Sequence, residues 1–199
     1  MTNFKYAVAL TGGIATGKSS AAELFSKEGF EIIDADKIAH QILDEQAEQI
    51  AMLFGAVYLT EGHVDRKALG RLVFSDVQKR KKLESLLHPL IQEEIASLSN
   101  ILDRTKFPYL VDVPLFFELG AYPIVQTIVV YAPKEIQVER LMRREGYSRI
   151  EAWQRLEAQM DIEIKKKQAT YVIDNSGDRD QLVRECQRVS HAILTKNKL

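Results

Sequence analysis

Short apolar runs alternate with stretches of helical periodicity along the chain, and this order is typical of a parallel α/β sheet. Two of the runs, Tyr109–Val113 and Val125–Tyr131, are rich in β-branched residues, as is usual for buried strands. The runs that we expect to form strands are Tyr6–Leu10, Phe30–Asp34, Tyr109–Val113, Val125–Tyr131 and Thr170–Ile173. The pattern therefore predicts a sheet of these five strands with helices on both faces.

Helical patterns fill the segments between these runs. One helix is expected from near Lys18 to Gly29, and another opens at Pro133. Ser148 and Glu151 have the spacing of a capping box, which predicts a further helix start. The closing C-terminal helix has an apolar inner face made by Leu182, Val183, Cys186, Val189 and Ile193.

A long helical tract covers about residues 36–102 and separates the second expected strand from the third. We expect two interruptions in it, at residues 55–62 and at His88-Pro89, where proline suits the first turn of a new helix. The chain has no internal repeat and no Pro- or Ser-rich linker. Any second lobe is therefore inserted into a single domain.

Composition and charge narrow the class of protein. The 199 residues include 27 Lys and Arg against 28 Asp and Glu, which argues against a protein that coats nucleic acid or an anionic membrane. The single Cys186 excludes an intrachain disulfide and a Cys-based zinc site. The longest uncharged stretch, Leu119–Pro133, is shorter than the roughly 20 apolar residues of a membrane span. We expect a soluble, cytoplasmic protein without a nucleic-acid or membrane partner.

The strongest chemical signal lies between the first expected strand and the first helix. The motif G-x-x-x-x-G-K-[ST] is matched by Gly12-Gly13-Ile14-Ala15-Thr16-Gly17-Lys18-Ser19. Glycines let backbone N–H groups turn inward around phosphates, and the helix that follows adds the positive end of its dipole. Lys18 supplies a charge for the β- and γ-phosphates, and the Ser19 hydroxyl is a suitable Mg²⁺ ligand. The pattern predicts a nucleoside triphosphate site.

Carboxylates follow two of the expected strands. Asp34 and Asp36 come at the end of the second strand, where open α/β sheets bind their ligands. One of them can act as an acceptor-binding base, whereas the alternative is that Asp36 only caps the next helix. Asp112 ends the third strand, where a Walker-B-type carboxylate holds Mg²⁺ or its waters.

Arginines gather after the fourth strand. Arg140, Arg143 and Arg144 have i, i+3 and i+4 spacing and so share one helix face. Such a face fits a lid that folds over a triphosphate, although a solvated charged face has the same pattern. The sequence has no [NT]KxD motif for guanine, no LSGGQ-like segment and no G-x-S-x-G elbow. Phosphoryl transfer to a small acceptor is the simplest interpretation.

The chain resembles the dephospho-CoA kinase family in an ordered series of motifs that extends through most of its length. The P-loop is shared with many unrelated activities, whereas the ordered set is much more specific. Its members are Leu10–Ile14, Asp34–Asp36, Asp65-Arg66, Leu69-Gly70, Val73-Phe74, Leu87–Ile91, Asp112–Glu118, Gln137, Arg140, Gln159 and Val172–Asn175.

The resemblance implies a P-loop NTPase-type core with two additions. The core comprises residues 1–36, 106–133 and 169–199, with an acceptor-binding helical insertion at about 37–105 and a helical lid at about 134–168. The implied reaction is the Mg²⁺- and ATP-dependent phosphorylation of the ribose 3′-hydroxyl of dephospho-CoA, giving CoA and ADP. It requires no obligate protein partner.

The resemblance also assigns roles to individual residues. ATP is bound by Gly12, Gly13, Ile14, Ala15, Thr16, Gly17, Lys18, Ser19, Ser20 and Asn175. The acceptor contacts Asp34, Asp36, His88, Leu115 and Phe117. The catalytic residues are Asp36, Lys18, Arg140 and Arg144, with Asp36 as the base. Ser19 and Asp112 hold Mg²⁺, partly through water.

Two positions depart from the family pattern. Thr170 follows Ala169 where the family usually has Asp, which puts any role of that carboxylate in doubt. Ala15 replaces a frequent glycine, a change that is tolerated if φ is negative there.

Two alternatives stay open at this point. One is a P-loop kinase of another small acceptor, such as a nucleoside, a nucleotide or a shikimate-like alcohol. A pantetheine-bearing acceptor needs an apolar groove in the helical insertion, which a nucleoside does not. The other alternative is a non-catalytic ATP-binding regulator, which would need no base and so would tolerate Asp36→Asn.

Overall fold

The computed structural model describes residues 4–197. The chain forms two compact units, one made by the segment up to Ile33 together with the segment from Leu98 onward, and the other by Asp34–Ser97. Each unit is described by itself below.

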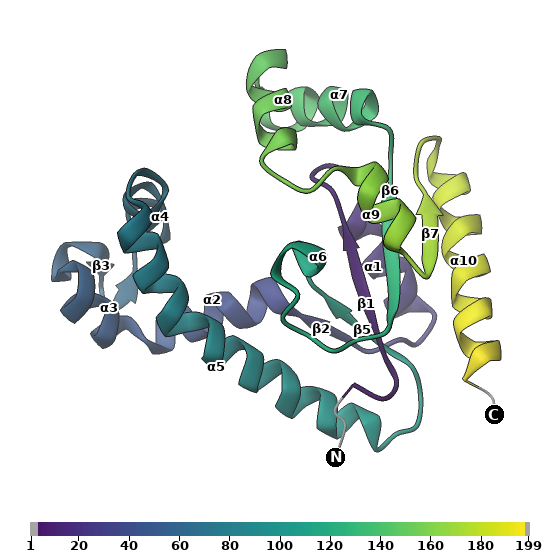
Figure 1. The fold of residues 1–199 in the computed structure, drawn as a ribbon, viewed down its shortest axis with the longest axis horizontal. Helices are drawn as coiled ribbons and strands as arrows, with labels where there is room; N and C mark the ends of the chain where they lie inside the picture. Colours follow the sequence, from purple (N-terminus) through teal and green to yellow (C-terminus); the bar gives the residue numbers. More distant parts are fainter. Residues whose placement is uncertain (1–3, 198–199) are drawn as a thin grey trace. The chain divides into compact units, whose positions relative to one another are not determined.

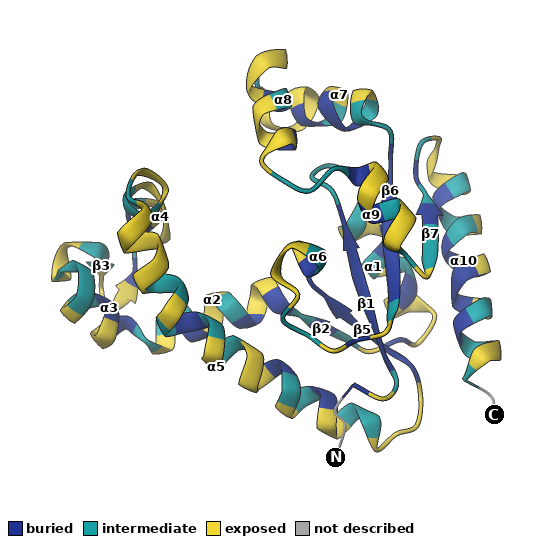
Figure 2. Cartoon of the chain, in the orientation of Figure 1, coloured by how far each residue is buried: buried dark blue, intermediate teal, exposed yellow. Residues whose placement is uncertain are grey.

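The first unit is built on the five-stranded sheet that the apolar runs predict (Figure 1). The strands are β1 (Ala7–Gly12), β2 (Ile32–Asp34), β5 (Tyr109–Asp112), β6 (Gln126–Tyr131) and β7 (Tyr171–Asp174). Their order is β2-β5-β1-β6-β7, and β1 pairs in parallel with both β5 and β6. All residues of β1 and β5 are buried, so the P-loop follows the central strand of a fully covered sheet (Figure 2).

Helices cover both faces of the sheet. Because successive residues of β6 point to opposite faces, the strand packs against different helices on each side. Ile128 and Val130 pack with α1 (Lys18–Lys27) and α10 (Arg179–Lys196). Val129 and Tyr131 instead pack with α9 (Ile162–Gln168) and with Phe117 on α6 (Phe116–Leu119). The predicted inner face of α10 is largely confirmed, since Leu182, Cys186, Val189 and Ile193 are buried and Val183 is partly buried.

Cys186 lies in the center of this α1–α10 core and forms no disulfide. Burial, together with the charges of Glu28 and Glu185, raises the pKa of its thiol to about 12. The thiol is therefore protonated and unreactive in the folded protein.

Two helices, α7 (Lys134–Glu145) and α8 (Arg149–Glu157), form a pair between β6 and α9. They share a small core that includes Leu141 and Leu156, against which Ile14 and Ala15 of the P-loop pack. The predicted capping box is confirmed: the Glu151 backbone N–H donates to the Ser148 hydroxyl, and the Glu151 carboxylate accepts from the Ser148 N–H.

The second unit has its own helical core around Ile50 and Leu69. Its helices are α2 (Ala35–Glu45), α3 (Ala47–Phe54), η1 (Ala56–Tyr58), α4 (Arg66–Ser75) and the first part of α5 (Val77–Asp103). The expected interruption at residues 55–62 contains β3 (Leu59–Thr60), which forms an antiparallel hairpin with β4 (His63–Val64) just beyond it. Glu61 and Gly62 turn the chain there, and both have positive φ, as a tight hairpin turn requires.

The second expected interruption is wrong, because α5 continues through Pro89 to Asp103. A proline inside a helix removes one hydrogen bond and costs about 3 kcal/mol. Leu87 and Ile95 are buried on either side of it, and burial of such side chains offsets a cost of this size. At the end of α5, the Asp103 carboxylate accepts hydrogen bonds from the backbone N–H groups of Lys5 and Tyr6.

Across residues 4–197, no helix is long and apolar enough to cross a membrane.

Candidate active site

The P-loop joins β1 to α1, as the sequence predicts, and its glycines are required by close contacts. A Cβ on Gly12 would lie 2.7 Å from Thr16 Oγ1 and 2.8 Å from Val130 O. Gly17 has a φ of 92°, and a Cβ there would lie only 2.2 Å from Asn175 Nδ2. The backbone therefore approaches its neighbours more closely than any side chain allows.

Ala15 has a φ of 58°, so the condition of a negative φ, under which an alanine is easily tolerated, is not met. The left-handed conformation costs a non-glycine residue about 1–2 kcal/mol. The loop holds Ala15 in it because the alanine packs against the α7–α8 core while its neighbours follow the phosphate-binding turn. The strain lies at the site itself, as is common where a backbone is shaped for a ligand.

We expect the Ala15→Gly variant to release this strain. Part of the gain is offset because glycine has more freedom in the unfolded chain, so the free energy of unfolding should rise by at most about 1 kcal/mol. Urea denaturation measures this change, and turnover should stay close to that of the wild type. A variant less stable than the wild type by about 1 kcal/mol or more would contradict the presence of strain at Ala15.

The P-loop, α7 and the segment after β7 meet at the Thr16 carbonyl oxygen. Asn175 Nδ2 donates to it at 2.7 Å, and Arg140 Nη1 lies 3.5 Å from it. Arg140 Nη2 also donates to the Asn175 carbonyl oxygen at 2.9 Å. Burial, and then the charge of Arg143, lower the pKa of Arg140, which nevertheless stays charged. Arg140 and Asn175 together fix the P-loop against its neighbours.

The other two arginines of α7 are exposed. Arg144 Nε donates to Glu145 Oε1 at 2.7 Å, and no such contact joins Arg144 to the P-loop in the described part of the chain. The i, i+3, i+4 pattern therefore brings only Arg140 into contact with the P-loop.

Lys18 and Asp112 form an ion pair at the start of α1. The Lys18 side chain is 18% exposed and that of Asp112 is 8% exposed, so the pair is mostly shielded from water. Ser19 and Ser20 follow on α1 and are exposed. Residues 4–197 contain no group of three or more His, Cys, Asp or Glu that could hold a metal. The carboxylate of Asp112 and the hydroxyl of Ser19 are hard oxygen donors. This donor set fits Mg²⁺, which takes few protein ligands and shares phosphate oxygens with its substrate.

A cavity of about 290 Å³ lies between α1 and the segment after β7. Its lining includes both apolar and charged side chains next to the P-loop. These residues are Ser20, Glu23, Leu24, Lys27, Arg140, Asn175, Gly177, Asp178, Arg179 and Leu182.

The residues assigned to the acceptor lie in both units. Leu115 and Phe117 belong to the first unit, where Leu115 is 38% exposed and Phe117 packs on the face of the sheet that carries α9. Asp34, Asp36 and His88 belong to the second unit, where His88 is partly buried in the middle of α5.

The two carboxylates after β2 differ in their contacts. Asp34 caps α2, since its carboxylate accepts from the Lys37 backbone N–H at 3.0 Å. The cap is therefore Asp34, and the alternative in which Asp36 caps the helix is wrong. Asp36 is exposed in the first turn of α2, and its carboxylate forms no hydrogen bond or ion pair with any residue between Phe4 and Asn197. Of the two, Asp36 has the carboxylate that is open to a substrate.

A sequence model of the dephospho-CoA kinase family matches residues 6–181 of the chain. The chain belongs to the dephospho-CoA kinase family. Its relatives include the dephospho-CoA kinase of Sulfurimonas denitrificans, 53% identical over 97% of this chain and 96% of that protein. That of Wolinella succinogenes is 47% identical over 97% of both chains. The solved dephospho-CoA kinase structure from Campylobacter jejuni has a TM-score of 0.79 and 39% identity, covering 96% of this chain and 98% of that one.

Membership of the dephospho-CoA kinase family makes this chain a kinase, in a family that acts at the last step of CoA biosynthesis. It also confirms the predicted fold, a five-stranded parallel sheet flanked by helices, as that of a P-loop kinase. A kinase that uses ATP requires a divalent metal in general.

Thr170, the departure from the usual dephospho-CoA kinase sequence, has a structural role. Its backbone N–H donates to Thr127 Oγ1 at 3.0 Å, and its own hydroxyl accepts from the Thr127 N–H at 3.1 Å. These reciprocal bonds join the residue before β7 to β6. A hydroxyl that both donates and accepts suits this position, which lies at the amino end of β7.

Sequence reasoning missed Lys165 of the dephospho-CoA kinase fold. Its ammonium group is fully buried and contacts the P-loop, the segment after Asp112 and Glu118. In the sequence it begins the run Lys165-Lys166-Lys167, which is typical of a solvated helix face. The sequence offers only one signal for its role, the spacing of six residues from Gln159, and this spacing cannot be interpreted without the fold.

Proposed function

We propose that this protein transfers the γ-phosphate of ATP to the 3′-hydroxyl of the ribose of dephospho-CoA, giving CoA and ADP. The observation that carries the proposal is the Lys18–Asp112 pair at a complete P-loop, in a chain that belongs to the dephospho-CoA kinase family. The exposed Asp36 carboxylate supports catalysis rather than nucleotide sensing, because a regulator needs no base.

The donor half of the reaction is assigned to the first unit. Backbone N–H groups of residues 12–20 surround the phosphates, and the Lys18 ammonium turns from Asp112 toward the β- and γ-phosphates. The nucleoside is assigned to the cavity beside α1, which Asn175 helps to line. Arg140 stabilises negative charge that develops on the transferred group, and Arg144 takes part when α7 closes over the triphosphate.

The acceptor contacts are assigned to individual residues. Leu115 and Phe117 offer apolar contact to the acceptor, and His88 and Asp34 contribute polar contacts. Asp36 accepts the proton of the 3′-hydroxyl or orients that hydroxyl toward the phosphorus. The base has limited work in such reactions, because the transition state is loose and most catalysis is positioning and charge neutralisation. Asp34 holds the first turn of α2 and thereby the direction of the Asp36 side chain.

The metal is assigned as Mg²⁺, held by the Ser19 hydroxyl and the Asp112 carboxylate, partly through water. When bound, it neutralises charge on the β- and γ-phosphate oxygens. Substrates are the only partners proposed, without an obligate protein partner, nucleic acid or membrane. A single cysteine, which allows no intrachain disulfide, supports a reducing, cytoplasmic location.

The test is ADP release by the purified chain with Mg-ATP in the presence of dephospho-CoA, adenosine, AMP or shikimate. We expect Mg²⁺-dependent turnover with dephospho-CoA alone. Turnover with another alcohol in its place would leave a P-loop kinase with a different acceptor. ATP binding without any turnover would favour the regulator.

A further inference from the structure

The Lys165 side chain is a buried cation between three segments of the first unit. It has no exposed surface, and its Nζ donates to the Gly12 carbonyl oxygen at 3.0 Å and lies 3.4 Å from that of Pro114. The third contact is an ion pair of 2.7 Å with Glu118 Oε1. An ammonium group has three N–H donors, so these three acceptors use its full capacity.

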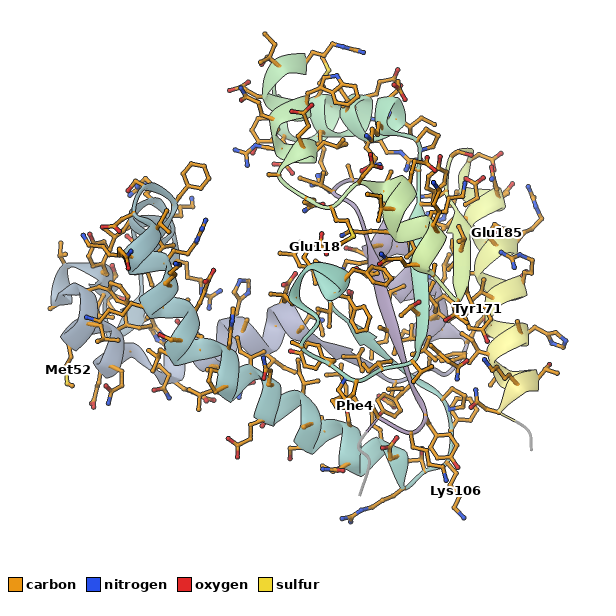
Figure 3. All side chains as sticks on the ribbon, in the orientation of Figure 1. Phe4, Met52, Lys106, Glu118, Tyr171 and Glu185 are labelled. Carbon is orange, nitrogen blue, oxygen red and sulfur yellow. The ribbon has the colours of Figure 1, made fainter. Side chains whose placement is uncertain are left out.

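The three contacts lie on segments with different roles. Gly12 is the first residue of the P-loop. Pro114 and Glu118 stand on either side of the segment that contains Leu115 and Phe117, the residues assigned to the acceptor. Glu118 lies at the end of this segment, on α6 (Figure 3). The same cation therefore holds the phosphate-binding loop and both ends of the acceptor segment.

Further hydrogen bonds reinforce this junction. Thr11 Oγ1 also donates to the Pro114 carbonyl oxygen, at 2.9 Å. Gln159 Oε1 accepts from the Ile14 backbone N–H at 2.9 Å, so residues 159 and 165 bind the P-loop at two points. Glu118 Oε1 accepts in addition from the Met160 N–H at 3.1 Å. The segment between α8 and α9 is thus bound both to the P-loop and to Glu118.

We propose that Lys165 is a positioning residue that fixes the acceptor segment Pro114–Glu118 at a set distance from the P-loop. The proposal rests on the function proposed above, since it needs Leu115 and Phe117 to contact the acceptor. Its physical basis is that phosphoryl transfer depends on the alignment of donor and acceptor. The Lys165 ammonium is the shared partner of the P-loop and the acceptor segment. The charge matters because the fully buried Lys165 ammonium has the Glu118 carboxylate as its counter-charge.

The test compares Lys165→Met with Lys167→Met, an exposed lysine on the same helix. We expect Lys165→Met to lower kcat and to raise the KM for dephospho-CoA, with a combined loss in kcat/KM of about tenfold or more, since small misplacements of reacting groups can cost 10²-fold. The dissociation constant of Mg-ATP, measured by calorimetry without acceptor, should change by less than about threefold, because the contacts of Lys18 and Thr16 remain.

A purely structural role would lower the melting temperature and leave both constants of the folded fraction unchanged. That result, or kinetics equal to those of Lys167→Met, would overturn the proposal. An equal loss of ATP affinity would also overturn it, since Lys165 would then act on the P-loop alone.

Glu118→Gln provides a second variant in case Lys165→Met does not fold. It preserves the shape and one acceptor oxygen but removes the counter-charge. We expect it to raise the KM for dephospho-CoA with little change in ATP affinity, and an unchanged KM would count against the proposal. Lys165→Arg should recover part of the lost kcat/KM, because it retains the charge but not the compact shape of the donor. If the proposed function fails, the wild type shows no turnover with dephospho-CoA, whereas failure of the Lys165 proposal appears only in variants of a wild type that is active with it.

Discussion

The Asp36→Asn variant is expected to lose about 10²-fold or more in kcat with dephospho-CoA, in the range of a lost general base. Asn has almost the same size but cannot accept the proton of the 3′-hydroxyl at neutral pH. Asp36 is exposed, and its carboxylate forms no hydrogen bond or ion pair with other described residues, so stability should not change. Steady-state kinetics with Mg-ATP in excess, together with a thermal melt, measures both quantities.

Asp34→Asn is the matched control. It makes the same change two residues earlier, and Asn is as good an N-cap as Asp, so α2 keeps its first turn. We expect a loss in kcat of less than about tenfold, well below that of a missing base. If Asp34→Asn lost more activity than Asp36→Asn, the base would have to be reassigned to Asp34.

A loss of about 10²- to 10³-fold in kcat/KM for ATP is expected for Lys18→Met, as for the removal of one group that stabilises transition-state charge. Methionine has a similar length and no charge, so the γ-phosphate loses its cation. The variant also removes the mostly shielded Lys18–Asp112 ion pair, and the melting temperature should fall. Kinetics at varied ATP and thermal melts measure the two effects.

Lys18→Arg separates these effects. Its guanidinium can still pair with Asp112, so stability should return toward that of the wild type. Its planar shape differs from a compact ammonium, and activity should remain low. Recovery of full activity in Lys18→Arg would mean that charge alone, rather than its placement, is needed at this position.

The strands and the P-loop could be predicted because their signals are local. Each apolar run between turn residues became a strand, and the loop motif lies where the strand and helix patterns require it. The predicted helix break at Pro89 is wrong because only the free-energy cost of the proline can be seen in the local sequence. The packing of α5 that offsets this cost involves residues distant in the sequence. The β3–β4 hairpin escaped prediction since Glu61-Gly62 is a less familiar turn sequence than Asn-Gly.

Some features of the site could not be predicted from the sequence, because they depend on how the chain folds. The helix start after β2 offered two candidate caps, and only the backbone geometry identifies Asp34. Lys165 looks like its exposed neighbours because burial is a property of the assembled core. The positive φ of Ala15 follows from the turn around the phosphates and not from the residue. The roles assigned to the other site residues stay predictions until the variants are measured.

The single cysteine gives this protein an internal reporter of opening. Cys186 is enclosed between α10 and the sheet, and its thiol is protonated at neutral pH. A thiol reagent can modify it only after α10 separates from the sheet, so the rate of labelling follows how often that part of the core opens. Because no other thiol competes, cysteines placed elsewhere on the surface can carry probes without prior removal of the native one.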